Sequence, residues 1–175
     1  MVSHKMRLFF LCSGLALSVV AKGEIIKDCD LIRQAKLYGA KNPQLVLAIS
    51  DVESSKNSKV ISRQDSRNVH YGLMQVKLGT ARMMGFKGHP KDLLQWKTNL
   101  KLGIDYLNEK LEKHHSMQAA AAAYNAGAVY ICRKGKVCKR GSFTNQGYVD
   151  RVMVHYRKYA KLQCLDPVPS KLANK

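Results

Sequence analysis

Apolar residues recur at helical spacing over most of the chain. The pattern is clear in residues 24–38, 45–54 and 148–159, and clearest where apolar positions follow at intervals of four, three and four, at Leu100, Ile104, Leu107 and Leu111. An apolar stripe at this period is typical of an amphipathic helix that packs one face on a core. The sequence therefore predicts several helices, one of them long.

Capping residues predict where these helices begin and end. Gly39 is expected to stop the first helix, and Asn42-Pro43 supplies an N-cap and a first-turn proline for the second. Ser116 can cap an alanine-rich helix that Asn125 and Gly127 would close. These signals place helix boundaries at four points along the chain.

Residues 54–70 are polar and have no period, which predicts a loop or a short two-stranded ribbon. Residues 80–84 suit a short helix closed by Gly85. The sequence shows no long strand run, no repeat and no Pro/Gly-rich linker. We therefore expect a mostly α single domain with a small polar loop or β-ribbon region.

One carboxylate, Glu53, lies on the apolar side of its predicted helix. At 100° per residue, Val46, Ile49 and Glu53 share a sector of about 60°, whereas Asp51 points the other way and is expected to be solvated. A carboxyl packed over aliphatic side chains is disfavoured as an anion and can keep its proton near neutral pH. Glu53 is therefore the candidate general acid; the alternative is a helix-end acid paired with a lysine.

The first 23 residues have the pattern of a secretory signal peptide. Lys5 and Arg7 precede the apolar run 8–20, and small residues near Ala21 and Gly23 offer a cleavage site. A membrane anchor is the alternative, but the run is shorter than the roughly 20 residues of a spanning helix. We expect a signal peptide at 1–23, a catalytic domain at 24–165, a flexible tail at 166–175, and export to the periplasm or beyond.

Four cysteines follow the signal segment, which in an exported chain favours disulfides over metal or redox chemistry. Cys132 and Cys138 are close in sequence, and pairing them would leave Cys29 to join Cys164. All three possible pairings stay open from sequence. The six histidines have no spacing that argues for a metal, and no cofactor is expected.

The formal net charge of +18 predicts an anionic partner. Nucleic acid is not favoured, because the chain has no recognition motif and only 7% aromatic residues. Anionic cell-envelope polymers are the better candidates. The alternative is that the charge serves solubility or docking alone.

Three short stretches together resemble the soluble lytic transglycosylases. They are Glu53-Ser54, then Gly72-Leu73-Met74-Gln75, then Ala123-Tyr124-Asn125-Ala126-Gly127. Support comes from a serine before the second stretch, Gly79-Thr80-Ala81 after it, and a later helix with Asn99, Gly103 and Tyr106-Leu107. The resemblance covers residues 30–160 and implies a goose-type-lysozyme-like fold that cleaves peptidoglycan.

Matched residue by residue, the resemblance assigns the catalytic acid to Glu53. Ser54 would orient the carboxyl and the helix end, and Tyr124 would bring its hydroxyl to the acid. The other residues matched to the substrate cleft are Ser66, Gly72, Met74, Gln75, Asn125 and Tyr148. Lys77-Leu78 departs from the Met-Pro frequent in the family, and Asn145-Gln146 from Thr-Arg, which leaves subsite preference open.

The implied reaction uses one residue as acid and then base. Glu53 would protonate the leaving oxygen and then take the proton of the muramyl C6 hydroxyl as it closes onto C1, giving a 1,6-anhydro end. One rival is a muramidase, with Asp65 or another group positioning water. Another is a cationic peptidoglycan-binding assembly factor. By analogy, a secretion, conjugation or pilus machine is a further expected partner.

Overall fold

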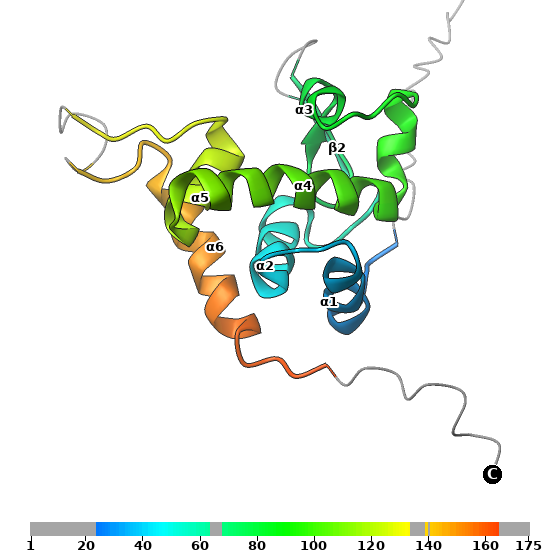
Figure 1. Ribbon diagram of the computed structural model, residues 1–175, viewed down its shortest axis with the longest axis horizontal. Coiled ribbons are helices and arrows are strands. Elements are labelled where there is room, and N and C mark those ends of the chain that lie inside the picture. Colours follow the sequence, from blue (N-terminus) through cyan, green and yellow to red (C-terminus); the bar gives the residue numbers. More distant parts are fainter. Residues whose placement is uncertain (1–23, 64–67, 134–138, 140, 165–175) are drawn as a thin grey trace, which may run out of the picture.

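The computed structural model describes residues 24–63, 68–133, 139 and 141–164 of the 175-residue chain. In Figure 1 the longest helix, α4, crosses the molecule, with α1 and α2 below it and a small sheet with α3 (Leu78–Met83) above it. Helix α5 follows α4, and α6 then runs down beside α2. The main helices are α1 Asp28–Leu37, α2 Pro43–Ser54, α4 Trp96–His114, α5 Met117–Ala126 and α6 Gln146–Tyr159.

The helix boundaries confirm the capping signals. The Asn42 side chain accepts a hydrogen bond from the Leu45 backbone N–H at 3.0 Å, and Pro43 is the first residue of α2. Ser116 caps α5 in the same way, and Gly39 adopts a positive φ of 74° just after α1. Local side-chain chemistry therefore sets where these helices start and stop.

The predicted ribbon is confirmed by two antiparallel strands, β1 Ile61–Arg63 and β2 Val69–Tyr71, and a third strand from the next stretch of the chain extends it to a small sheet. This third strand is β3 Val76–Lys77, and the strands pair in the order β1-β2-β3. A tight turn at residues 72–75 reverses the chain between β2 and β3, with positive φ at Gly72 and Gln75. A two-residue strand carries no periodicity, so only its partner reveals it. Short helices α3 Leu78–Met83 and η1 Pro90–Leu94 follow.

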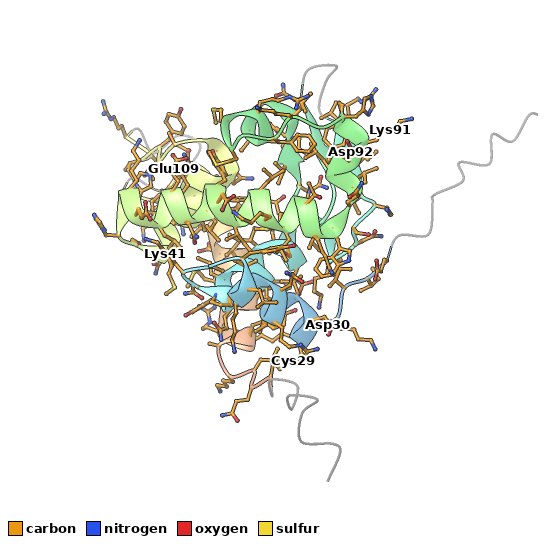
Figure 2. All side chains as sticks on the ribbon, turned by 45° about the vertical axis from the view of Figure 1, so that its right-hand side comes forward. Cys29, Asp30, Lys41, Lys91, Asp92 and Glu109 are labelled. Carbon is orange, nitrogen blue, oxygen red and sulfur yellow. A yellow bond between two sulfur atoms is a disulfide. The ribbon has the colours of Figure 1, made fainter. Side chains whose placement is uncertain are left out.

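The core lies where α2, α4 and α5 meet. Residues 45–49 of α2 and 120–123 of α5 are fully buried, and the alanines let α5 pack closely against its neighbours. Charged side chains such as those of Lys41, Lys91 and Glu109 point outward (Figure 2). Across the described segments, no helix has the length and apolarity that crossing a bilayer requires.

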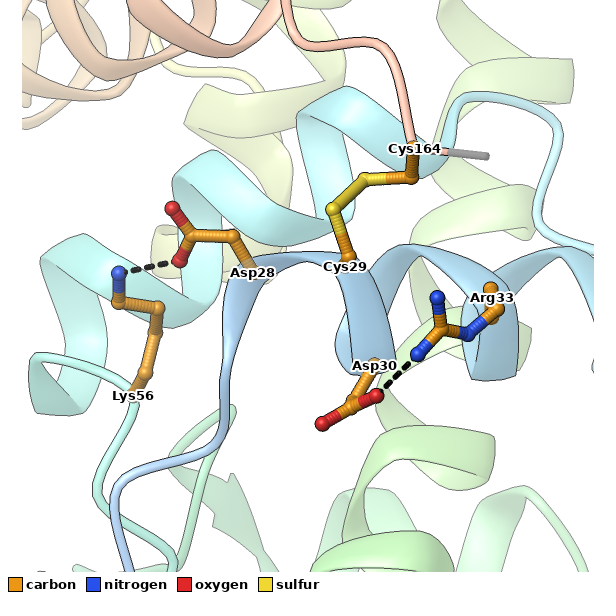
Figure 3. The surroundings of a disulfide bond; sticks show 6 residues. All are labelled: Asp28, Cys29, Asp30, Arg33, Lys56 and Cys164. Atoms are coloured by element: carbon orange, nitrogen blue, oxygen red, sulfur yellow. Dashed lines mark hydrogen bonds and ion pairs between the residues drawn. A yellow bond between two sulfur atoms is a disulfide. The ribbon is translucent and has the colours of Figure 1, made fainter. Parts of the chain in front are cut away.

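The predicted disulfide between Cys29 and Cys164 is confirmed. It joins α1 to the segment after α6, with 5.4 Å between the two Cα atoms (Figure 3). Cys132 is also disulfide-bonded. Its predicted partner, Cys138, lies outside the described residues, as do the signal segment and the tail, so these assignments stay predictions.

Candidate active site

A pocket of about 170 Å³ opens where the end of α2 meets the sheet, α4 and the end of α5. Each element contributes polar side chains to its wall: Glu53 from α2, His70 from β2, Lys77 from β3, Tyr106 from α4, and Tyr124 and Asn125 from α5. Residues far apart in sequence thus converge around the predicted acid.

The carboxyl of Glu53 is half-buried in this wall, and its protonation is strongly perturbed. Burial raises its pKa from 4.5 to about 7, because an anion loses hydration there. The Tyr148 hydroxyl, which donates to Oε1 at 2.7 Å, and the nearby Arg151 guanidinium both act in the opposite direction. Near neutral pH the carboxyl can therefore both hold and release a proton.

The hydroxyl that hydrogen-bonds the acid belongs to Tyr148, a bond that the resemblance did not indicate. Tyr124 lines the pocket, but its hydroxyl donates to the Met74 carbonyl at 2.9 Å. Its pKa is raised well above the usual value by burial and by the nearby Glu53 charge. Tyr124 therefore stabilises the turn at residues 72–75, whereas Tyr148 of α6 hydrogen-bonds the carboxyl itself.

Gln75 lines the pocket, as predicted, and its amide is fully engaged. Its Nε2 donates to the carbonyls of Gly72 at 2.8 Å and Val60 at 3.1 Å, and its Oε1 accepts from the Ser62 hydroxyl at 2.6 Å. These bonds stabilise its positive φ of 49°. Sequence reasoning gave Ser62 no role, and only its contact with Gln75 identifies it.

Ser54 joins the catalytic helix to the turn at residues 72–75. Its hydroxyl donates to the Leu73 carbonyl at 2.7 Å and to the Ser50 carbonyl within α2. Both bonds of the Ser54 hydroxyl go to backbone carbonyls, so Ser54 positions the end of the helix relative to the sheet. Asn125 lies at the pocket as predicted, where its Oδ1 accepts from the Asn145 amide at 2.9 Å.

Met74 and Gly72, which the resemblance matched to the substrate cleft, are buried and are not among the described residues that line the pocket. Met74 has no exposed surface and packs on Gly103. A Cβ added at Gly103 would lie only 2.4 Å from the Met74 sulfur, so only glycine leaves room for this side chain. At Gly72, φ is 71° and a Cβ would lie 2.6 Å from the Leu93 carbonyl oxygen. Both residues are therefore needed for the turn and its packing. Ser66 and Asp65 lie outside the described residues.

Asn99 holds this turn from the opposite side. Its Oδ1 accepts from the Met74 N–H at 2.7 Å, and its Nδ2 donates to the carbonyls of Tyr71 and Leu93. The side chain is fully buried in α4. Asn99 lies about 100° from the Leu100 stripe of the predicted helix, so the helical period alone did not indicate its burial.

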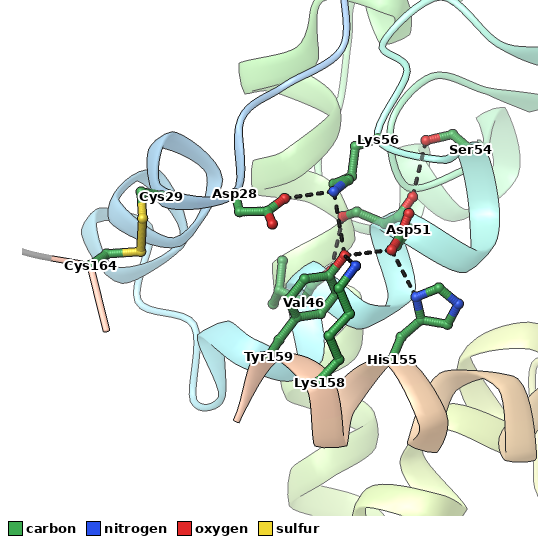
Figure 4. Close-up of polar contacts among 11 residues, drawn as sticks. Asp28, Cys29, Val46, Asp51, Ser54, Lys56, His155, Lys158, Tyr159 and Cys164 are labelled. Carbon is green, nitrogen blue, oxygen red and sulfur yellow. Dashed lines mark hydrogen bonds and ion pairs between the residues drawn. A yellow bond between two sulfur atoms is a disulfide. The ribbon is translucent and has the colours of Figure 1, made fainter. Parts of the chain in front are cut away.

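Asp51 is not solvated as expected but belongs to a polar cluster on the far side of α2. The Tyr159 hydroxyl and His155 Nδ1 both contact its Oδ2, and the Lys56 ammonium joins the cluster through Tyr159 (Figure 4). Burial raises the pKa of Asp51, but these hydrogen bonds and positive charges outweigh it and hold the pKa below its usual value. Asp51 therefore stays an anion that joins α2 to α6, away from the pocket.

Within the described segments, no three His, Cys, Asp or Glu side chains come together as metal ligands. Among the described residues at the pocket, Glu53 is the one carboxylate. The polar groups around it suit proton transfer and the binding of a hydroxyl-rich ligand.

Burial of Glu53 predicts a pH-dependent stability effect. Between about pH 4.5 and pH 7 the folded protein keeps a proton that the unfolded chain has released, so stability falls as the pH rises through this window. Glu53→Gln removes this cost. We expect it to raise the unfolding free energy by about 1–3 kcal/mol at pH 8 and by almost nothing at pH 4. Urea unfolding at both pH values measures this, and an equal gain at the two would contradict it.

A helical domain with an acid at the end of one helix, facing a small antiparallel sheet, is a lysozyme-like fold. The chain belongs to the transglycosylase SLT domain family, whose sequence model matches residues 30–146.

A curated relative is the membrane-bound lytic murein transglycosylase C of Photorhabdus laumondii, 33% identical over 122 residues. The match covers 61% of this chain and 33% of the relative, so the chain spans about a third of that protein. A similar solved structure is an inactive mutant of lytic transglycosylase Slt from Pseudomonas aeruginosa, with a TM-score of 0.56 at 24% identity, covering 75% of this chain and 23% of that one. Another is the 70-kDa soluble lytic transglycosylase in complex with bulgecin A, with a TM-score of 0.54 at 24% identity. That match covers 79% of this chain and 25% of the other. These two likenesses concern the fold.

Proposed function

We propose that this protein is a peptidoglycan lytic transglycosylase that cleaves the β-1,4 bond between N-acetylmuramic acid and N-acetylglucosamine. One observation carries the proposal: a half-buried carboxyl with a pKa of about 7 lies in the wall of a polar pocket, held by the Tyr148 hydroxyl. Family membership supports the same chemistry. An acid whose pKa matches the working pH can donate and recover a proton in one turnover.

The proposed reaction has two proton transfers at Glu53. The protonated carboxyl gives its proton to the glycosidic oxygen, and N-acetylglucosamine leaves. The carboxylate then takes the proton of the muramyl C6 hydroxyl as its oxygen bonds to C1, which closes the 1,6-anhydro ring. The neighbouring acetamido group can stabilise the positive charge at C1 between these steps.

The pocket suits a mechanism with a single carboxylate. Glu53 has no carboxylate companion among the described lining residues, and Asp51 is held in its cluster behind α2. The C6 hydroxyl belongs to the same sugar as C1, so its attack is intramolecular, and such proximity can lower a barrier by up to about 7–11 kcal/mol. No water needs to be positioned by a second acid.

Product analysis tests the proposal. Sacculi are digested with the wild-type protein, and the released fragments are analysed by mass spectrometry. We expect anhydro-muramyl ends, lighter by one water molecule than the reducing ends that hydrolysis leaves. Reducing ends would instead indicate a muramidase. Binding without any cleavage would indicate a peptidoglycan-binding assembly factor.

Tyr148→Phe tests the hydrogen bond to the acid. The free enzyme needs protonated Glu53, so kcat/KM should fall as the pH rises past about 7. Loss of the Tyr148 hydroxyl removes a bond that lowers the pKa of Glu53, so this decline should move to higher pH. We also expect kcat/KM at pH 6 to drop about 10–100-fold as the carboxyl loses its orientation.

The matched control for this variant is Tyr156→Phe. Tyr156 lies on the same helix, but its hydroxyl contacts Asn42 rather than Glu53. Its pH–rate profile should match that of the wild type. A Tyr148→Phe profile without any displacement would show that the hydroxyl does not tune the acid.

We further propose that the protein works in the cell envelope after removal of residues 1–23. The disulfide between Cys29 and Cys164 suits an oxidising compartment, and the curated relative is a membrane-bound murein enzyme by name. A role beside a secretion, conjugation or pilus machine rests on analogy with small proteins of this family. Fractionation of cells that express the full chain tests the location, and an uncleaved cytoplasmic product would refute it.

A further inference from the structure

We propose that Lys77 forms an anionic subsite in the pocket and binds a carboxylate carried by the muramic acid unit of the glycan. The inference rests on the proposed function and adds a basis for substrate preference. It assigns the recognition of a charged substrate group to the side of the pocket that β2 and β3 form.

Lys77 and His70 form one side of the pocket together. They are directly paired across β2 and β3, and both line the cavity that Glu53 lines from α2. Residues paired across antiparallel strands project from the same face of the sheet. The pocket therefore has a basic wall on the sheet and an acid on the helix.

The ammonium of Lys77 has no carboxylate partner among the described residues. Its Nζ donates to the Asn68 side-chain oxygen at 3.2 Å, a neutral acceptor. Other lysines of the described chain, such as Lys41, Lys56 and Lys101, each contact a carboxylate within 2.6 Å. The charge of Lys77 is thus available to a ligand in the pocket.

The Lys77 charge also affects the neighbouring pocket residue, His70. Burial lowers the pKa of His70, and the Lys77 charge lowers it further. The imidazole Nε2 is buried and makes no hydrogen bond within the described structure. An anion bound next to Lys77 would raise the pKa of His70 again, because a negative charge favours the protonated imidazole. A protonated imidazole can donate a hydrogen bond from Nε2. The two residues therefore favour a negatively charged ligand group.

Chemistry narrows the identity of that group. In a glycan of alternating N-acetylglucosamine and N-acetylmuramic acid, only the muramic acid carries a carboxyl, either as its free lactyl group or through the attached stem peptide. A lysine on the pocket wall would therefore distinguish peptidoglycan from an uncharged N-acetylglucosamine polymer of the same length. Lys77 stands where the resembling family often has an uncharged methionine, so the subsite would be a property of this chain.

The test measures binding in a Glu53→Gln background, so that it does not depend on turnover. Three soluble oligosaccharides of equal length are titrated calorimetrically: peptide-free peptidoglycan glycan, peptide-bearing glycan, and an N-acetylglucosamine oligomer. Lys77→Met should weaken binding of the carboxylate-bearing glycans about 3- to 30-fold, the range for a partly desolvated charged contact. It should leave the uncharged oligomer unchanged.

Two further variants sharpen the result. Lys77→Arg keeps the charge and should keep most of the affinity, whereas Lys101→Met, on the outer side of α4 and away from the pocket, should have no effect. Added salt should weaken the binding of carboxylate-bearing glycans to the protein that keeps Lys77, and it should weaken their binding to the Lys77→Met variant less. A loss confined to the peptide-bearing glycan would assign the carboxylate to the stem peptide, and a loss confined to the peptide-free glycan would assign it to the free lactyl group. A loss with both would show that the subsite accepts either carboxylate.

Equal losses for charged and uncharged oligosaccharides, or no loss with any, would overturn the subsite. Those outcomes leave the proposed function intact if the wild-type protein still forms anhydro products. Conversely, a charge-dependent binding preference without any cleavage would refute the proposed function and keep the subsite.

Discussion

Glu53→Gln should abolish glycan cleavage, with a loss in kcat of about 10³-fold or more. Glutamine has nearly the same shape as the protonated acid but can neither donate a proton to the leaving oxygen nor accept one from the C6 hydroxyl. General acid–base catalysis contributes about 10²–10⁴-fold in a single transfer, and here both transfers use one group. Glycan binding should persist, because the pocket wall keeps its form. Release of soluble fragments from purified sacculi measures the loss.

The matched control is Glu112→Gln on α4. Glu112 is an exposed carboxylate that pairs with Lys41 at the surface, and it is not among the residues that line the pocket. Its variant should cleave at the wild-type rate. If Glu53→Gln kept a tenth or more of the wild-type rate, another group would have to supply the proton, and the assignment of the acid would be wrong.

The helices could be predicted from sequence because their determinants are local. The spacing of Leu100, Ile104 and Leu107, and the Asn42-Pro43 start of α2, depend on neighbours within one or two turns. The position of Glu53 at the pocket follows from the same helical period. The acid was therefore accessible from sequence, together with the helix that carries it.

The environment of Asp51 could not be predicted because its partners are distant in the chain. Tyr159 lies 108 residues further on and His155 lies 104, and both reach Asp51 only because α6 packs against α2 (Figure 4). Helical period shows that Asp51 faces away from Glu53, but it does not show what covers that face. A polar residue opposite a core face is usually solvated, and the packing of α6 reverses this expectation.

Distant packing also explains why the sequence could not show which of the two tyrosines hydrogen-bonds the acid. Tyr124 and Tyr148 each lie on the apolar face of a helix, and both are nearly fully buried. The angle at which α5 and α6 approach α2 decides which hydroxyl meets the carboxyl. Sequence spacing contains no information on that angle, so it can bring both rings to the site but cannot assign their hydrogen bonds.

Asn99→Ala should cause the largest loss of stability among the side chains that support the site. The change removes three hydrogen bonds and leaves the Met74 N–H and two backbone carbonyls without partners in a buried region. Each such group costs about 1–3 kcal/mol, and partial relaxation should bring the total to about 3–5 kcal/mol. Urea unfolding followed by circular dichroism measures it.

Asn108→Ala is the matched control, because Asn108 lies on the same helix and also bonds two backbone groups. Its Oδ1 accepts from the Lys41 N–H at 3.0 Å and its Nδ2 donates to the Gly39 carbonyl at 2.9 Å, but these groups are exposed. Water can replace the amide there, so the cost should be about 1 kcal/mol. If the two variants lost equal stability, the turn at residues 72–75 would not depend on Asn99. The wall that Gln75 presents to the pocket would then have to be held by the sheet and by Ser54 alone.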